Sequence, residues 1–260
     1  MSRGLAAVDD ELAVRLATAA GRVLCALREE TGFDDPAALR ALGDRRSHEY
    51  LLGELERHRP DDAVLSEEGA DDAGRLTCPR VWIIDPLDGT REYAERGRTD
   101  WAVHVALWQD GELAAGAVAM PARGQVLSTA GARLAERGAA RNGSLRLAVS
   151  RTRAPALVQG LATELDAELV PMGSAGVKIG AVVLGAVDAY VHGGGQYEWD
   201  SAAPVAVARA ARCHASRLDG SPLVYNQPDA WLPDLVVCRP ELRDRLLAAI
   251  SATATAERTS

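Results

Sequence analysis

The sequence is poor in three features that would assign it to particular protein classes. Its four cysteines, Cys25, Cys78, Cys213 and Cys238, are far apart and form no C-x-x-C pair, which argues against zinc and favours reduced core residues. No apolar run reaches the roughly 18 residues that a membrane helix needs. There is also no excess of basic residues, since the net charge is −8, which argues against nucleic-acid or membrane-surface partners. A cytoplasmic protein is expected.

The composition is that of a globular protein with a sizeable core. Of its 260 residues, 47% are hydrophobic and 25% are charged, so the chain can form one large domain or two small ones. Apolar residues recur every three or four positions over 9–30, which predicts an amphipathic helix. A second helical pattern follows Asp44, which we interpret as its N-cap.

Strand patterns dominate the middle of the chain. Apolar runs over 81–84, 102–108, 113–120 and 125–129 predict an antiparallel meander, with Asp110 and Gly111 as a hairpin turn. After residue 151 the pattern alternates between helix and strand, which predicts a layered α/β arrangement. The expected elements are helices at 154–165, from 175, beyond 201 and at 241–250, and strands at 168–172, 189–192 and 235–238.

The most informative segment is Trp82–Thr90, where an apolar run ends in Asp85-Pro86-Leu87-Asp88-Gly89-Thr90. Pro86 fixes φ, so the chain is expected to turn at once and bring the two aspartates toward a common point. Gly89 permits close approach to a phosphate, Thr90 offers a hydroxyl, and the next residues could begin a helix whose free N–H groups favour an anion. The pattern predicts a divalent-metal phosphate site.

An ordinary Asp-Pro-x-Asp-Gly surface turn explains the same residues without a metal. Two further acidic clusters favour the metal. Glu67 follows the apolar run at 63–65, and Asp200 lies just before a helix-like segment. Carboxylates at the ends of several elements are typical of a site for a hard divalent cation.

These motifs together resemble those of the inositol monophosphatase-like superfamily of magnesium-dependent phosphatases. The segment 82–90 is similar to its first signature and 199–204 to its second, while 66–68 and 43–44 match its upstream acidic positions. The resemblance implies a layered αβαβα sandwich, classed as α+β or α/β, of the inositol monophosphatase and fructose-1,6-bisphosphatase type. We expect residues 1–145 to form an N-terminal half that carries the metal motifs, and 146–260 a C-terminal half that completes the site in one compact unit.

The resemblance also assigns roles. It implies two or three Mg²⁺ ions, bound by Glu67, Asp85, Asp88, Asp200 and the Leu87 carbonyl, with Asp44 positioning a third ion and its water. Thr90 and Glu67 would activate the attacking water, and the Gly89 and Thr90 N–H groups would hold the phosphate. The further substrate contacts it implies are Arg91, Ser174, Lys178 and Asp200.

Three features favour a nucleotide substrate. Arg91-Glu92-Tyr93 and the loop 172–178, which ends in Lys178, resemble 3′(2′),5′-bisphosphate nucleotidases of an actinobacterial, CysQ type, and Gly193 replaces an acidic residue that grips inositol in the monophosphatases. This chain also departs from the pattern of the superfamily. A lysine and a Pro-Val-Thr stretch often precede the position of Asp44 there, whereas residues 38–42 of this chain read Ala-Leu-Arg-Ala-Leu.

Our first hypothesis is therefore a phosphatase that removes the 3′-phosphate of adenosine 3′,5′-bisphosphate, and also of its sulfated precursor, in sulfate assimilation. Lithium sensitivity and a homodimer are family-level expectations. The alternative enzyme is a broader inositol-1-phosphate or fructose-1,6-bisphosphate phosphatase. The non-enzyme alternative is a metal-dependent sensor of phosphorylated metabolites.

Overall fold

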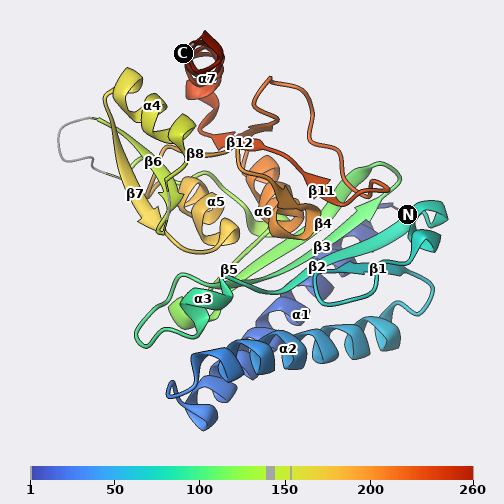
Figure 1. Cartoon of the computed structure of the whole chain (residues 1–260). Helices are drawn as coiled ribbons and strands as arrows, with labels where there is room; N and C mark the ends of the chain where they lie inside the picture. The colour runs from blue at the N-terminus through green and yellow to red at the C-terminus, as the bar shows by residue number, and fades with distance from the viewer. Residues whose placement is uncertain (1, 139–143, 153, 260) are drawn as a thin grey trace.

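Helices and sheets alternate in five layers over residues 2–138, 144–152 and 154–259, which are the residues that this computed structural model describes (Figure 1). The order is helix pair, sheet, helix pair, sheet, helix pair. This is the αβαβα sandwich that the motif resemblance implies, and the solved structures of similar fold described below confirm it.

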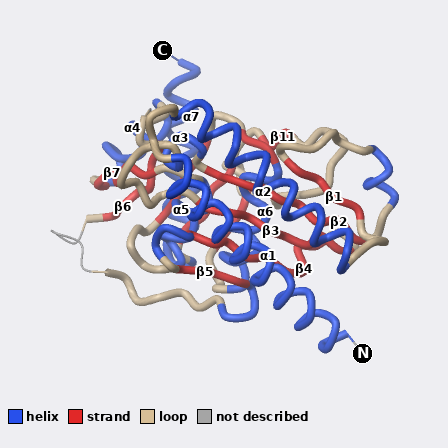
Figure 2. Tube along the Cα trace, turned by 90° about the horizontal axis from the view of Figure 1, so that it is seen from below, coloured by secondary structure: helices blue, strands red, loops and turns tan. Residues whose placement is uncertain are grey.

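The first layer consists of α1 (Ser2–Thr31) and α2 (Pro36–His58), which lie together along one face of the first sheet (Figures 1 and 2). The predicted first helix is confirmed, but the start of the second is wrong. Asp35, not Asp44, is the N-cap, because its side chain accepts hydrogen bonds from the Ala37 and Ala38 N–H groups and Pro36 begins the helix. Asp44 therefore lies within α2, near its middle.

The first sheet has the strand order β1-β2-β3-β4-β5. Its antiparallel meander and the Asp110–Gly111 turn are confirmed, and both turn residues have positive φ, as a two-residue hairpin requires. β1 adds a parallel edge strand that the meander prediction omits. The strands are β1 (Ala63–Ser66), β2 (Arg80–Asp88), β3 (Ala102–Gln109), β4 (Glu112–Met120) and β5 (Gln125–Ser128). The single helical turn α3 (Thr90–Tyr93) follows β2.

The second sheet has the order β10-β12-β8-β6-β7. It is mixed, because β6 pairs in parallel with β7 and β8, whereas β12 pairs in antiparallel with β8 and β10. A separate two-stranded ladder joins β9 to β11. The strands are β6 (Leu145–Ser150), β7 (Ala167–Met172), β8 (Ala189–His192), β9 (Gln196–Tyr197), β10 (His214–Ser216), β11 (Trp231–Leu232) and β12 (Leu235–Cys238). Short 3₁₀ helices occupy Ala73–Thr77, Pro121–Arg123, Thr129–Gly131 and Pro240–Leu242.

Between the sheets lie α5 (Ala175–Val183) and α6 (Glu198–Ala210), and the outer layer consists of α4 (Ala156–Leu165) and α7 (Arg243–Thr259). All nine residues of α5 are buried. α6 begins at Glu198, earlier than predicted, because the Asp200 carboxylate accepts the Tyr197 N–H at 2.7 Å and caps the first turn. Asp200 is thus inside the helix rather than before it.

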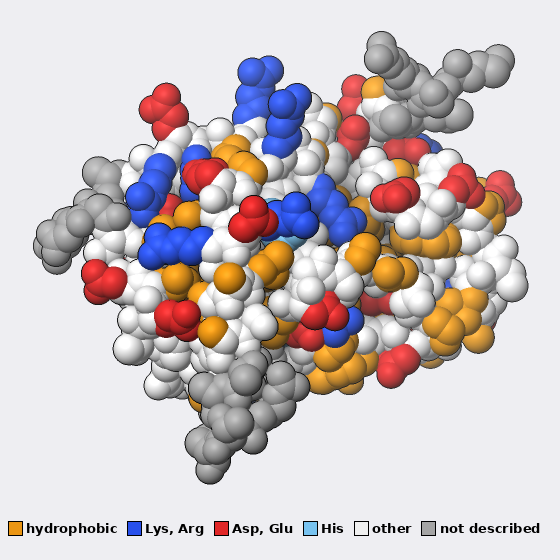
Figure 3. Space-filling view, turned by 90° about the horizontal axis from the view of Figure 1, so that it is seen from above, with side chains coloured by type: hydrophobic (Ala, Val, Ile, Leu, Met, Phe, Trp, Pro, Cys, Tyr) orange, Lys and Arg blue, Asp and Glu red, His pale blue; other side chains and the backbone are white. Residues whose placement is uncertain are grey.

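Burial agrees with the composition. Apolar side chains form one cluster under α1 and α2, one between the sheets and one under α4 and α7. All four cysteines are free; Cys213 and Cys238 are buried, while Cys25 and Cys78 are half-buried. No helix among the described residues is long and apolar enough to cross a membrane. On the face seen in Figure 3, basic side chains gather near the middle, with acidic and hydrophobic ones between and around them.

Candidate functional site

The two aspartates of the central motif lie together at the end of β2. The strand continues through Pro86 to Asp88, so the expected turn directly after Asp85 is wrong. A bulge instead interrupts the pairing of β2 with β3 between Asp85 and Asp88. Residues three apart in a regular strand point to opposite faces, and the bulge removes that difference. Both side chains consequently reach one buried cluster, where their ligand atoms lie within 4.8 Å of each other.

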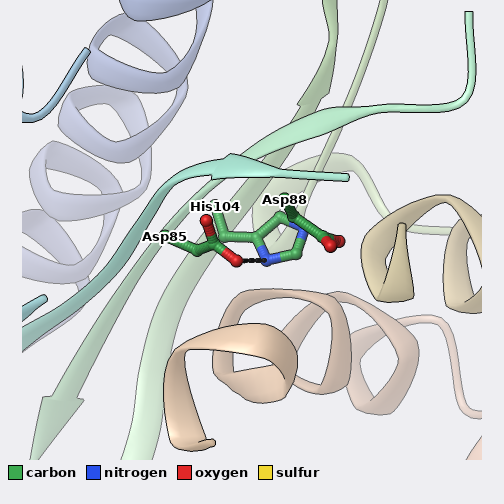
Figure 4. Close-up of side chains that lie close together, drawn as sticks. All are labelled: Asp85, Asp88 and His104. Carbon is green, nitrogen blue, oxygen red and sulfur yellow. Dashed lines mark ion pairs between the residues drawn. The ribbon is translucent and has the colours of Figure 1, made fainter. Parts of the chain in front are cut away.

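His104 is the third member of this cluster, and sequence reasoning missed it (Figure 4). It lies directly opposite Asp85 on β3 and is fully buried. Its Nδ1 is 3.2 Å from the Trp199 carbonyl oxygen and 3.9 Å from Asp85, while its Nε2 is 3.2 Å from Asp88 Oδ2. The contact of Nε2 with Asp88 lacks hydrogen-bond alignment. The antiparallel pairing of β2 with β3 within the predicted meander is the signal that could have found His104.

Asp88 also contacts the segment that begins α5. Its Oδ2 accepts hydrogen bonds from the Ser174 hydroxyl and, at 2.8 Å, from the Gly176 N–H at the start of α5. Burial alone would raise the pKa of Asp88, but the His104 ring and these two donors outweigh it and lower the pKa. The carboxylate is therefore held ionised with one oxygen occupied, which leaves Oδ1 for a cation.

The remaining carboxyls surround this pair and repel one another. Burial, followed by the charges of Glu67, Asp88 and Asp200, raises the pKa of Asp85 well above its usual range. Burial and the Glu68 charge raise the pKa of Asp44 to about 7. Desolvation and the charge of Asp200 raise the pKa of Glu67 to about 7. Desolvation and Asp88 raise the pKa of Asp200 to about 6.

The glycine and threonine after the aspartates begin a helix, as predicted. Gly89 has φ +85° and precedes α3, and a Cβ there would lie 3.3 Å from the Asp100 carbonyl oxygen and from Ser174 Cβ. Only glycine fits this strained and crowded position without cost. Thr90 is the first helical residue and is half-buried, whereas Arg91 is exposed. Leu87 is buried, and its N–H donates to Asp85.

A cavity of about 340 Å³ opens beside Asp88. Of the predicted residues it brings together Asp88, Asp200, Ser174 and Lys178. Arg91 is not part of its wall. The other residues that line it are Ala175, Tyr190, His192, Gly195, Gln196, Tyr197 and Trp231. Lys178 is 7% exposed, with its Nζ 5.2 Å from the centre of the Tyr190 ring, and burial lowers its pKa despite the nearby carboxylates.

The donor set fits a hard divalent cation. Carboxylate oxygens, such as those of Asp85 and Asp88 on β2 and of Asp200 on α6, are the ligands that Mg²⁺ and Mn²⁺ prefer. Burial and the charges of the neighbouring carboxylates raise the pKa of Asp85, and a bound cation would offset that repulsion. The structure therefore groups Asp85 with Asp88 in one buried cluster and places Asp88 and Asp200 on one cavity wall, and these carboxylates have the chemistry to hold metal.

Comparisons with known proteins agree with this geometry. The model of the inositol monophosphatase family matches residues 8–254. The 3′-phosphoadenosine 5′-phosphate phosphatase of Mycobacterium leprae is 54% identical over 254 residues, with 93% of each chain covered. The 3′(2′),5′-bisphosphate nucleotidase CysQ of Escherichia coli is 30% identical over 200 residues, which cover 73% of this chain and 80% of CysQ.

Solved structures show the same fold. The crystal structure of CysQ from Bacteroides thetaiotaomicron superposes with a TM-score of 0.71 at 26% identity and covers 92% of this chain and 97% of its own. Inositol monophosphatase II from Staphylococcus aureus superposes with a TM-score of 0.74 at 21% identity, with 89% and 91% covered. The chain belongs to the inositol monophosphatase family.

Proposed function

We propose that this protein is a metal-dependent phosphatase that hydrolyses the 3′-phosphate of adenosine 3′,5′-bisphosphate to give adenosine 5′-monophosphate, in sulfate assimilation. The phosphatase of Mycobacterium leprae, similar over 93% of the chain, carries this substrate in its name. The observation that carries the proposal is the cavity wall, where the carboxylates of Asp88 and Asp200 and the buried cation of Lys178 line one space. A substrate with two phosphates needs both kinds of group.

In this proposal the acidic cluster holds two or three Mg²⁺ ions. Asp85, Asp88, Asp200, Glu67 and the Leu87 carbonyl are the ligands that we assign. Bound magnesium supplies Lewis-acid stabilisation of the phosphoryl oxygens and a water that is easier to deprotonate. Asp44, which burial and Glu68 keep near neutral pKa, is assigned to a third ion and its water.

This chain's own residues orient the reaction. Thr90 and Glu67 hold the attacking water, and the backbone N–H groups of Gly89 and Thr90 donate hydrogen bonds to the phosphate oxygens at the start of α3. The Ser174 hydroxyl donates a hydrogen bond to Asp88, and this bond fixes the orientation of the carboxylate toward the metal position. Displacement by water in line needs no phosphoenzyme.

Lys178 binds the second phosphate. Because the side chain is buried, its charge is poorly screened and acts strongly on an anion in the cavity. Arg91 is the second residue of α3 and is exposed. From this position it would contact only a phosphate that lies at the protein surface. A cytoplasmic location, lithium inhibition and a homodimer stay predictions.

Analysis of the product tests the proposal. Purified protein with Mg²⁺ and adenosine 3′,5′-bisphosphate should give inorganic phosphate and adenosine 5′-monophosphate in equal amounts, resolved by ³¹P NMR, and a chelator should stop the reaction. Adenosine 3′-monophosphate as the product would reverse the assigned orientation of the substrate. Binding of the bisphosphate without release of phosphate would favour the sensor.

A further inference from the structure

Two aromatic side chains at the edge of the cavity have no role in the chemistry described above. Tyr197 and Trp231 both line the cavity beside Asp200 and Lys178. They are 44% and 45% exposed, which places them at its solvent-facing rim. Large aromatic groups seldom remain this exposed, since burying them is favourable, and an exposed aromatic patch at a cavity indicates a binding role.

The backbone fixes the positions of these two rings. Tyr197 on β9 and Trp231 on β11 are directly opposed in an antiparallel ladder. The Trp231 ring meets the Tyr197 ring edge to face, with centroids 5.2 Å apart and planes at 78°, and Tyr197 stacks on Trp199 at 4.6 Å and 10°. The rings are therefore ordered before any ligand binds, which lowers the entropy that binding costs.

Gly195 makes this arrangement possible. It has φ +80°, and a Cβ on it would lie 1.8 Å from Cζ2 of Trp231, so only glycine lets the indole lie against this backbone. Next to it, Gln196 lines the cavity and is 8% exposed, and its Nε2 has no hydrogen-bond partner among the described residues. A buried amide donor without a partner is unfavourable, and an acceptor on a bound ligand would satisfy it.

The chemistry of this rim selects a flat ring. Aromatic faces bind heteroaromatic bases by stacking, because every base has a π-face that covers the aromatic ring. The cavity wall thus combines carboxylates for metal and phosphate, a buried ammonium for an anion, and an aromatic rim. A nucleoside bisphosphate has all three complementary parts.

We propose that Tyr197 and Trp231 form a nucleobase platform that makes this phosphatase select nucleotides over sugar phosphates. The inference rests on the proposed function, and it names the residues that would determine its specificity. In the platform the base stacks on the exposed aromatic surface at the rim, while the Gln196 amide donates to an acceptor on the base or ribose.

The test compares Trp231→Ala and Trp231→Phe with the wild type on two substrates. For adenosine 3′,5′-bisphosphate, Trp231→Ala should lower kcat/KM by about 10- to 100-fold, mostly through a higher KM, because stacking is made before and during the reaction. Trp231→Phe should recover most of this loss. For inositol-1-phosphate, which has no base, the same variants should change kcat/KM by less than about twofold.

Two further measurements separate a platform from a structural role. Isothermal titration with adenosine 5′-monophosphate in Mg²⁺ should show affinity falling in Trp231→Ala and returning in Trp231→Phe. The control Val126→Ala removes another exposed apolar side chain, on β5 and outside the cavity wall, and should change neither substrate. Equal losses on both substrates, or an alanine variant with wild-type KM for the nucleotide, would overturn the platform.

The two proposals fail in different ways. If the wild-type protein does not hydrolyse adenosine 3′,5′-bisphosphate, the proposed function fails and the platform with it. If the wild type hydrolyses it and Trp231→Ala is unaffected, the function stands and only the platform is wrong.

Discussion

Replacement of Asp88 by asparagine tests the arrangement of the site most sharply. In the protein, Ser174 and Gly176 donate to one oxygen of Asp88, and His104 faces the same oxygen. In Asp88→Asn the amide oxygen must take that place, because an NH₂ group there would face donors. The amide nitrogen then points toward the metal position, where it cannot act as a ligand.

The expected loss follows from this geometry. A metal site deprived of one charge and one ligand oxygen loses several kcal/mol of transition-state stabilisation. At about 1.4 kcal/mol per factor of ten, a loss of about 4 kcal/mol lowers kcat about a thousandfold. The fold keeps the two donor contacts, so stability should fall by only about 1–2 kcal/mol, or about 2–8 °C in Tm.

The assay is phosphate release with saturating Mg²⁺, with Tm measured on the same samples. Asp110→Asn is the matched control, because it removes the same charge in an exposed Asp-Gly hairpin turn where asparagine is equally suitable. It should keep full activity. An Asp88→Asn enzyme that is folded and retains more than about a tenth of the wild-type kcat would refute the reasoning.

Two further predictions concern pH and packing. Asp44 and Glu67 have pKa values raised to about 7 in the folded state, so they bind protons more tightly than in the unfolded chain. Metal-free stability should therefore fall as pH rises from about 4 to about 7, and the Tm gain from Mg²⁺, measured by calorimetry, should be larger at pH 8 than at pH 5.5; an equal gain would contradict this. Gly176→Ala would place a Cβ 2.0 Å from His104 Nε2 and should cost about 1–3 kcal/mol in chemical denaturation. The control is Gly53→Ala, at a helical position with open space, which should stabilise the protein by about 0.5–1 kcal/mol. If Gly176→Ala were as stable as Gly53→Ala, the His104 ring would have to move away from the new Cβ without cost.

Local patterns predicted the parts of the fold that depend on neighbouring residues. The hairpin at Asp110–Gly111 is confirmed because turn chemistry and apolar alternation act over a few residues. The helix start at Asp44 was wrong, since the sequence offers two acidic caps and the Asp35–Pro36 pair is the stronger one.

The missed features depend on contacts between distant segments. His104 looks like an ordinary residue of an apolar strand until the β2–β3 register sets it opposite Asp85. Trp231 reaches the cavity only through the short β9–β11 ladder, which no local pattern predicts at two residues per strand. Sequence therefore identified the aspartates that lie together at the end of β2, and the structure was needed to find what surrounds them.

The most direct test of the account is the substrate preference of the purified enzyme. Phosphate release in Mg²⁺ is measured for adenosine 3′,5′-bisphosphate, inositol-1-phosphate and fructose-1,6-bisphosphate over a range of concentrations. The account predicts that kcat/KM for the nucleotide exceeds the others by more than about a hundredfold, or about 2.7 kcal/mol. Comparable values for the three substrates would contradict it and make the protein a broad phosphatase.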